Sequence, residues 1–314
     1  MENQATTHRP RHRWARLVRV TIGLSCLLGL SASGGAFVTT ATASGLDTAV
    51  ASGAPMTQPV DVLATDDGTT NDYGVFLGLN PSKSAKLLSY STVVIDAQYF
   101  TKSQIAKIKQ AGVTVYSYLN IGSIEKFRHG YSKFKHKTLG KYAGWPGEYW
   151  MSPALLSWRN FIYTEAKALV AKGIDGFFID NTDVYAKYHK KAIFNGLVKI
   201  FNRLNKYNLP ILVNGGDTFV KAAILKPAKP KAKITGVNQE EVFSRIASNG
   251  KFKTQTAADT KYYKSYLAKC AKAGLAVYLL EYVKTSNTAL RAKINDYCAA
   301  TGYVCYISSS RNLV

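Results

Sequence analysis

The stretch GIDGFFIDNTDVY, residues 173–185, decides the fold. Its centre, 176–179, is a short apolar run without polar alternation, which is typical of a strand buried on both faces of a parallel sheet. Three acids surround this run: Asp175 precedes it, and Asp180 and Asp183 follow it. The chain of 314 residues has 41 Lys and Arg but only 19 Asp and Glu. Acids gathered around one buried strand therefore require an explanation.

The same alternation of short apolar runs and longer amphipathic stretches continues from residue 73 to the end of the chain. Gly112, Gly173, Gly274 and Gly302 each separate an amphipathic stretch from the next apolar run, where a left-handed helix cap is expected. The expected strands are 74–79, 92–96, 113–121, 176–180, 211–214, 234–238, 276–282 and 303–307. The expected helices are 83–89, 101–111, 153–172, 186–207, 216–225, 258–273 and 286–300. Eight strands alternating with helices predict an α/β fold, a (β/α)8 TIM barrel, as a single catalytic domain.

A doubly wound parallel sheet is the alternative fold. It would place a Gly-rich phosphate-binding loop after the first strand, and GLNPS at 78–82 does not fit that pattern. The barrel is therefore favoured.

The first 43 residues have the order of a secretory signal peptide. Five Arg between residues 9 and 19 precede an apolar run at 20–30, and ATA at 41–43 forms an A-x-A cleavage site. The apolar run is too short to span a bilayer comfortably, so an uncleaved membrane anchor is the less favoured alternative. We therefore expect a secreted protein with no stable membrane insertion after cleavage.

Residues 44–72 predict a flexible linker, because they combine five acids and no Lys or Arg with many Ala, Thr, Gly and Ser. Residues 73–314 then form one domain, which we expect to be a monomer. This domain has 36 Lys and Arg and 13 Asp and Glu, a formal net charge of +23. The basic residues are mostly dispersed Lys with no Arg-rich run or zinc motif, which disfavours nucleic acid as a partner. A diffuse Lys surface fits solubility and non-specific adhesion, including to a cell wall.

Cysteine and histidine spacing indicates neither a metal site nor a cofactor. The predicted domain has no Cys-x-x-Cys or His-x-x-x-His pattern, so a metal-dependent hydrolase is not expected. Its three cysteines allow one disulfide. Cys298 and Cys305 would close a short loop, whereas Cys270 and Cys298 would join adjacent helices; the first pairing is slightly favoured.

Barrel enzymes carry their chemistry at the carboxyl ends of the strands, and acids are concentrated there in this sequence. Seven of the 13 acids of the domain lie at or just after an expected strand end: Asp96, Glu125, Asp180, Asp183, Glu240, Glu241 and Glu281. Any one of them has a structural alternative, such as capping a helix or pairing with a Lys. Asp175, at the opposite end of its strand, fits a structural role better. Together, the acids suggest a general acid and a nucleophile acting on a glycosidic bond.

Several segments, taken in order, resemble glycoside hydrolase family 114, the endo-α-1,4-polygalactosaminidase family. The matching segments are VVIDAQYF (93–100), VYSYLNIGSIEKFR (115–128), WPGEYW (145–150), GIDGFFIDNTDVY (173–185), LVNGGDTF (212–219), GVNQEEVF (236–243) and LLEYV (279–283). The resemblance implies a (β/α)8 barrel in an exported or surface enzyme. It also implies a galactosamine-containing polysaccharide, partly deacetylated in some cases, as the substrate.

The same resemblance implies the roles of individual residues. Asp180 matches the nucleophile and Glu240 the acid/base of a retaining reaction. The positions that match the lining of the family's substrate-binding cleft are Asp96, Tyr118, Asn120, Glu125, Asp183, Asn214 and Tyr282. Two alternatives remain open: a non-catalytic polysaccharide-binding barrel, which would need neither catalytic carboxylate, and a glycosidase of the same fold that acts on another amino-sugar polymer.

Overall fold

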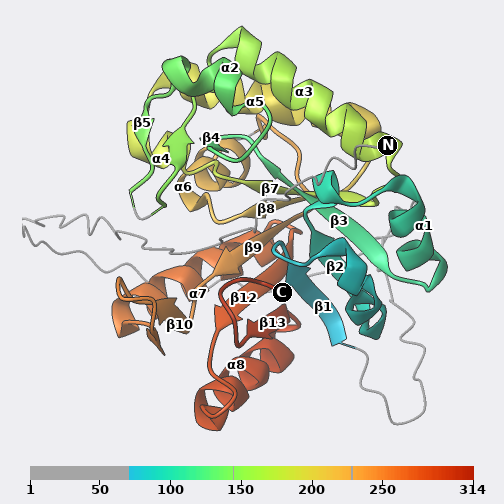
Figure 1. Cartoon of the computed structure of the whole chain (residues 1–314). Helices are drawn as coiled ribbons and strands as arrows, with labels where there is room; N and C mark the ends of the chain where they lie inside the picture. The colour runs from blue at the N-terminus through green and yellow to red at the C-terminus, as the bar shows by residue number, and fades with distance from the viewer. Residues whose placement is uncertain (1–70, 144, 228) are drawn as a thin grey trace, which may run out of the picture. The chain divides into compact units, whose positions relative to one another are not determined.

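Eight parallel strands form a nearly closed barrel in the computed structural model, which describes residues 71–143, 145–227 and 229–314 (Figure 1). Their order around the barrel is β1-β2-β3-β7-β8-β9-β12-β13, and β13 lies beside β1. The barrel strands are β1 (Asn71–Phe76), β2 (Tyr90–Ile95), β3 (Thr114–Asn120), β7 (Gly176–Asp180), β8 (Ile211–Asn214), β9 (Gly236–Glu240), β12 (Ala276–Tyr282) and β13 (Val304–Ser308). The predicted (β/α)8 fold is confirmed.

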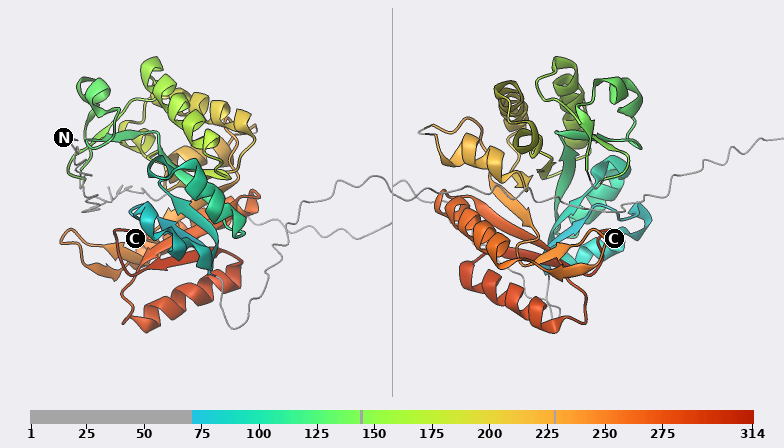
Figure 2. Two further views of the ribbon diagram at one scale, coloured as in Figure 1. Left: turned by 45° about the vertical axis from the view of Figure 1, so that its right-hand side comes forward. Right: turned by 90° about the vertical axis from the view of Figure 1, so that its left-hand side faces the viewer.

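The helices cover the outside of the barrel, as the two further views in Figure 2 show. The α-helices are α1 (Lys102–Gln110), α2 (Tyr131–Phe134), α3 (Leu156–Ala171), α4 (Val184–Tyr188), α5 (Lys191–Leu204), α6 (Asp217–Val220), α7 (Ala257–Lys272) and α8 (Thr288–Thr301). Shorter turns are η1 (Pro81–Ser89), η2 (Ala97–Tyr99), η3 (Lys135–Lys137), η4 (Asn205–Tyr207) and the π-turn η5 (Lys221–Leu225). In the described residues, no helix is long and apolar enough to cross a membrane.

Side-chain chemistry sets the helix ends. Thr101 forms a capping box with Gln104 at the start of α1, and Thr256 caps α7. Gly302 ends α8 in the left-handed conformation, which glycine adopts without steric cost. The single helix expected at 186–207 is instead two helices, because His189 adopts a positive φ of 43° and ends α4. The helix expected at 83–89 is the 3-10 turn η1, which begins at a proline.

Two barrel strands end elsewhere than expected. The first strand, expected at 74–79, already ends at Phe76, and the sixth strand ends later than expected. It was expected at 234–238, with Glu240 after it, but β9 continues to Glu240. Gln239 is polar and was expected to lie outside the strand, yet it is buried and its side-chain amide donates to the backbone oxygen of Glu240. Because β9 stays paired with β12 through Gln239 and Glu240, the strand continues and ends on the carboxylate.

Alternation along the strands separates the barrel interior from the outer layer. On β7, Phe177 and Ile179 pack among residues of the surrounding helices, whereas Phe178 packs inside the barrel. Asp180 follows Phe178 by two residues and therefore faces the interior at the end of the strand. The residues that end their strands with the same parity are Asn120, Asn214, Glu240 and Tyr282. These five polar side chains therefore point to the same opening, at the carboxyl ends of the strands, which we call the barrel mouth.

Two insertions extend this end of the barrel. Between β3 and α3 the chain forms a small antiparallel sheet of β4 (Ser123–Glu125), β5 (Gly140–Lys141) and β6 (Glu148–Trp150). After β9 it forms the hairpin of β10 (Ser244–Ile246) and β11 (Phe252–Thr254). The first insertion brings Glu125 and Glu148 opposite each other across β4 and β6. The predicted leader 1–43 lies outside the described residues, as does the predicted linker 44–72 except for its last two residues, which belong to β1.

All three cysteines of the described residues are free thiols, so neither predicted disulfide is formed in the structure. Cys298 and Cys305 nevertheless interact directly. The hydrogen bond between their side chains raises the pKa of Cys298 and lowers that of Cys305. Cys270 interacts with the hydroxyl of Tyr266 instead, and burial raises its pKa to about 11.

We expect oxidation to join Cys298 and Cys305 and to leave Cys270 as a free thiol, because contact and a lowered pKa favour thiolate attack within this pair. Peptide mapping of oxidised protein under non-reducing conditions measures the connectivity. Cys270→Ser should leave the cross-link intact, and Cys298→Ser should remove it. A bridge between Cys270 and Cys298, or three free thiols after oxidation, would contradict this expectation.

Candidate active site

One side-chain amide bridges the two predicted catalytic carboxylates. Asn214 Nδ2 donates to Asp180 Oδ1 at 3.1 Å and to Glu240 Oε1 at 2.7 Å. These two oxygens therefore lie no more than 5.8 Å apart, the sum of the two bond lengths. The three residues end neighbouring strands, β7, β8 and β9, which explains why the barrel brings them together.

Further hydrogen bonds fix the orientation of this bridge. Asn238 Nδ2 donates to Asn214 Oδ1 at 2.8 Å, and the hydroxyl of Tyr73 donates to Asn238 Oδ1 at 3.2 Å. Because the oxygen of Asn214 is occupied as an acceptor, its nitrogen faces the two carboxylates. On the other side, the hydroxyl of Tyr282 donates to Glu240 Oε2 at 2.9 Å. Both oxygens of Glu240 thus have donors.

Asp180 ionises less readily than an ordinary aspartate. Burial, and next the charge of Glu240, raise the pKa of Asp180 to about 7. The hydrogen bond from Asn214 works in the opposite direction, and the nearby Asp183 raises the pKa further. Near neutral pH Asp180 can therefore be either protonated or ionised, so this carboxyl can carry a proton or a negative charge.

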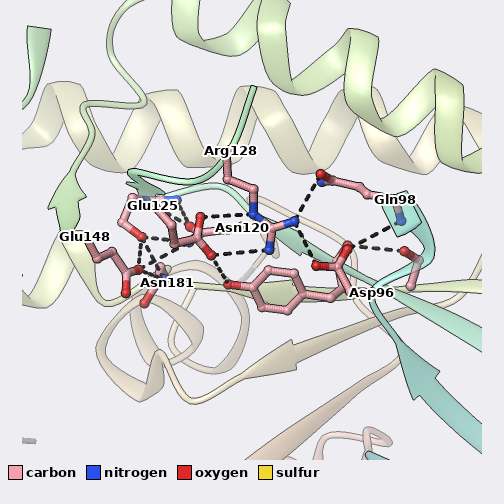
Figure 3. Close-up of polar contacts among 11 residues, drawn as sticks. Asp96, Gln98, Asn120, Glu125, Arg128, Glu148 and Asn181 are labelled. Atoms are coloured by element: carbon pink, nitrogen blue, oxygen red, sulfur yellow. Dashed lines mark hydrogen bonds and ion pairs between the residues drawn. The ribbon is translucent and has the colours of Figure 1, made fainter. Parts of the chain in front are cut away.

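A second cluster surrounds Arg128, which is buried (Figure 3). Its guanidinium pairs with Asp96 at 2.7 Å and with Glu125 at 3.3 Å, and it also donates to Gln98 Oε1 at 3.0 Å. The hydroxyl of Tyr118 donates to Glu125 at 3.3 Å. Burial raises the pKa of Asp96, and the charge of Arg128 offsets part of that increase. The cluster holds two buried carboxyls against one cation.

A further buried carboxyl, Glu148, lies beside the Arg128 cluster, opposite Glu125 across β4 and β6 (Figure 3). Its Oε1 accepts from Asn181 Nδ2 at 3.0 Å, from Asn120 Nδ2 at 3.4 Å and from the hydroxyl of Ser123. Burial, and next the charge of Glu125, raise the pKa of Glu148 to about 8, with a further increase from Asp180. Glu148 is therefore mostly neutral at pH 7 and can donate a hydrogen bond.

Close backbone approach makes the contact between Asn181 and Glu148 possible. A Cβ at Gly122 would lie 1.8 Å from the carbonyl oxygen of Asn181, so only glycine lets the insertion after β3 contact the loop after β7. Asn181 itself has a φ of 63°, a conformation that asparagine tolerates better than most residues. The positive φ of Asn181 and the absence of a side chain at Gly122 together place the side-chain amide of Asn181 against Glu148.

The structure divides the sequence-predicted residues into three groups. Asp180, Asn214, Glu240 and Tyr282 form the bridged pair and its support, with Asp183 close enough to affect the pKa of Asp180. Asp96, Tyr118 and Glu125 surround Arg128, and Asn120 contacts Glu148.

The remaining strand-end acids have structural roles. Glu281 accepts from the backbone amides of residues 242–244, and burial raises its pKa to about 7. Glu241 accepts from the backbone of Ile246 and so stabilises the hairpin that follows β9. Asp175 pairs with Lys109 at 2.5 Å and accepts from the backbone of Val115, as expected for the opposite end of β7.

Sequence reasoning missed Arg128, Gln98, Glu148, Ser123, Asn181 and Asn238. Arg128 and Glu148 lie inside segments that carried the family resemblance, but neither ends a barrel strand, so sorting acids by strand ends overlooked Glu148. Arg128 was counted among dispersed basic residues, although Arg is rare in this Lys-rich domain. Within the described residues, no group of three or more His, Cys, Asp or Glu side chains could hold a metal ion.

The model of the glycoside-hydrolase family GH114 matches residues 68–312. The chain belongs to this family. The protein is accordingly a glycoside hydrolase, and the family assignment suggested by the sequence is confirmed.

Solved structures with the same fold are distant in sequence. The glycoside hydrolase domain of PelA from Pseudomonas aeruginosa matches with a TM-score of 0.65 and 16% identity, covering 78% of this chain and 96% of that one. Ega3 of Aspergillus fumigatus, solved in complex with galactosamine, matches with a TM-score of 0.60 and 18% identity, covering 78% and 93%. An uncharacterized protein of Thermotoga maritima is 19% identical over 114 residues, 35% of each chain. The match thus spans about a third of that curated relative.

Asp180→Asn is expected to stabilise the protein increasingly between about pH 4 and pH 7. The pKa of Asp180 is raised in the folded state. Ionisation of Asp180 therefore lowers the free energy of unfolding as the pH rises from the ordinary pKa of 3.8 through about 7. An amide removes that loss, with a gain of at most about 4 kcal/mol above pH 7. Urea unfolding at pH 4.5 and pH 8 measures the difference.

Asp175→Asn is the matched control, at the other end of the same strand. It removes the ion pair with Lys109 and should not stabilise the protein at either pH. If Asp180→Asn changes the free energy of unfolding equally at the two pH values, folding does not raise the pKa of Asp180.

Proposed function

We propose that this protein is a secreted, endo-acting, retaining glycoside hydrolase that cleaves α-1,4-linked galactosamine or N-acetylgalactosamine polysaccharide. The observation that supports the retaining chemistry is the Asn214 bridge. The oxygens that it joins are at most 5.8 Å apart, whereas inverting enzymes need about 6.5–9.5 Å between their carboxyl groups to accommodate a water molecule. A pair this close favours direct attack by one carboxylate on the sugar.

In the proposed reaction Asp180 is the nucleophile and Glu240 the acid/base. Glu240 donates its proton to the glycosidic oxygen while ionised Asp180 attacks the anomeric carbon, so the glycosidic bond breaks as a glycosyl ester forms. Glu240 then accepts a proton from water, which attacks the same carbon and releases Asp180. The hydroxyl of Tyr282, hydrogen-bonded to Glu240 at 2.9 Å, orients the acid throughout.

Substrate charge would assist this division of roles. A positively charged amino group bound near Asp180 and Asp183 would lower the pKa of Asp180 and favour its ionised form. The other predicted lining residues, Asp96, Glu125, Tyr118 and Asn120, add carboxyl and hydrogen-bonding groups at the same end of the barrel. The family membership and the galactosamine complex of Ega3 support an amino sugar as the ligand.

The proposed domain organisation follows the sequence: a signal peptide at 1–43, a linker at 44–72, and the catalytic domain at 73–314, which acts as a monomer. Secretion would give the enzyme direct access to extracellular polysaccharide. No cofactor or metal is part of the proposed reaction, since both steps use only the two carboxyl groups and water.

Asp180→Asn and Glu240→Gln should each preserve the fold and abolish or strongly reduce cleavage. An amide neither attacks the anomeric carbon nor transfers a proton; loss of general acid/base catalysis alone costs about 10²–10⁴ in rate. Purified protein is incubated with galactosaminogalactan and with galactosamine polymers of defined acetylation, and the products are measured by mass spectrometry.

Asp175→Asn serves as the control and should retain near-normal turnover, because it changes the same residue type at the opposite end of β7. Near-normal turnover of either catalytic variant would overturn the assignment. The anomeric configuration of the first product, read by NMR, tests retention: a first-formed α-anomer fits a covalent intermediate, and a β-anomer excludes it.

The charge of the domain predicts how salt affects substrate preference. A fully deacetylated polymer is a polycation, which a domain of charge +23 repels over roughly 8 Å at physiological ionic strength. We therefore expect sparsely deacetylated polymer to be preferred. Added salt should speed cleavage of cationic polymer relative to neutral polymer, because salt screens the exposed lysines more than the buried carboxyls. The ratio of the two kcat/KM values at increasing salt measures this effect.

The opposite result has a clear meaning. If the fully deacetylated polymer is cleaved fastest at low salt and more slowly as salt is added, the field of the acidic mouth exceeds that of the basic surface, and the expected preference is wrong.

A further inference from the structure

A dense group of exposed basic side chains lies over the first insertion and the turn into α5. Residues 133–141 contain four exposed lysines and exposed His136, and residues 187–191 contain three exposed lysines and exposed His189. The two segments are in contact, because the hydroxyl of Tyr188 donates to the carbonyl oxygen of Leu139 at 3.0 Å. In Figure 1 their elements α2, β5 and α4 lie together at one side of the barrel. We call this surface the basic patch.

The basic patch has no counter-charge of its own. The sequence has no Asp or Glu at 131–142 or at 184–191. Across the described part of the chain, ion pairs within 4.0 Å involve Lys109 and Lys221 but none of the seven patch lysines. The lysines of the patch repel one another because no acid lies among them. Binding of an anionic partner would reduce this repulsion.

The composition of the patch restricts that partner. The basic residues of the patch are Lys and His, with no Arg. Lys binds phosphate as a point charge, whereas the planar guanidinium of Arg forms paired hydrogen bonds with bases or carboxylates. Nucleic-acid surfaces typically add Arg to their lysines, and the patch has none. The cationic substrate of the proposed reaction would be repelled. These features favour a flexible polymer of repeating phosphate groups.

We propose that the basic patch docks the protein onto a linear phosphodiester polymer of the poly(glycerol phosphate) type. The patch lies beside the barrel mouth: β5 of the patch pairs with β6, which carries Glu148, and α4 follows β7, which ends at Asp180. Docking therefore brings the acidic mouth close to the polyanion. A cationic amino-sugar polymer gathers on the same polyanion, so enzyme and substrate meet there; this last consequence rests on the proposed function, whereas docking does not.

The test compares two charge-matched triple variants of the full chain. Lys135→Gln, Lys137→Gln and Lys190→Gln remove three charges from the patch. The control variant removes three exposed lysines from α7, which packs on β9 and β12 away from the patch: Lys261→Gln, Lys269→Gln and Lys272→Gln. Binding to fluorescent synthetic poly(glycerol phosphate) is measured by anisotropy over a salt series.

The patch variant should bind at least about tenfold more weakly and lose about 2 from the slope of log K against log salt, since each lost contact with a flexible strand removes about 0.7. The control should stay within about twofold of the unmodified protein. Both variants should unfold at the same temperature as the parent and cleave short neutral oligosaccharide normally.

Equal weakening by the two variants would show attraction to net charge alone and overturn the docking surface. Tighter binding of single-stranded RNA than of poly(glycerol phosphate) at equal phosphate concentration, lost in the patch variant, would also overturn it in favour of nucleic acid. If the parent protein cleaves no galactosamine polymer, the proposed function fails, yet the binding comparison still decides the patch.

Discussion

The hydrogen bonds from one amide nitrogen, Asn214 Nδ2, to Asp180 and Glu240 are the interaction on which the rest of the site depends. Two buried acids at this distance repel each other when both are ionised, and the bridge offsets part of that cost. The bridge requires an oriented amide, which Asn238 and Tyr73 provide from inside the barrel. It also requires three consecutive strands that end on polar residues of the same parity. The chemistry therefore rests on the packing of the barrel interior.

The sequence pointed to Asn120, Asn214 and Tyr282 through the family resemblance, and strand alternation gives the physical reason why they lie with Asp180. Once 176–180 is a buried strand, Phe178 and Asp180 share one face, and the same rule aims Asn120, Asn214 and Tyr282 inward. The rule also separates structural acids, since Glu281 has the opposite parity and binds backbone amides outside the barrel. The barrel itself followed from the count of alternating elements.

Contacts that depend on three-dimensional approach were not predictable in this way. Glu148 reaches the site through a small antiparallel sheet whose pairing joins β4 and β6, and that pairing leaves no periodic trace in three-residue strands. Arg128 gains its role only because the segment with Asp96 and Gln98 approaches the segment that carries Arg128 and its neighbour Glu125. The end of β9 was placed too early because buried Gln239 and Glu240 are polar and resemble loop residues in the sequence.

The positions of the two groups of site residues have an evolutionary consequence. The bridged pair is built from the ends of three adjacent barrel strands, whereas Glu125, Arg128 and Glu148 come from the insertion between β3 and α3. Lengthening or replacing that insertion would change the lining of the mouth without moving Asp180 and Glu240, the two carboxyls proposed to react. Homologues with this scaffold can therefore differ in substrate specificity while they keep the same two carboxyls. We expect such homologues to vary most in length between β3 and α3.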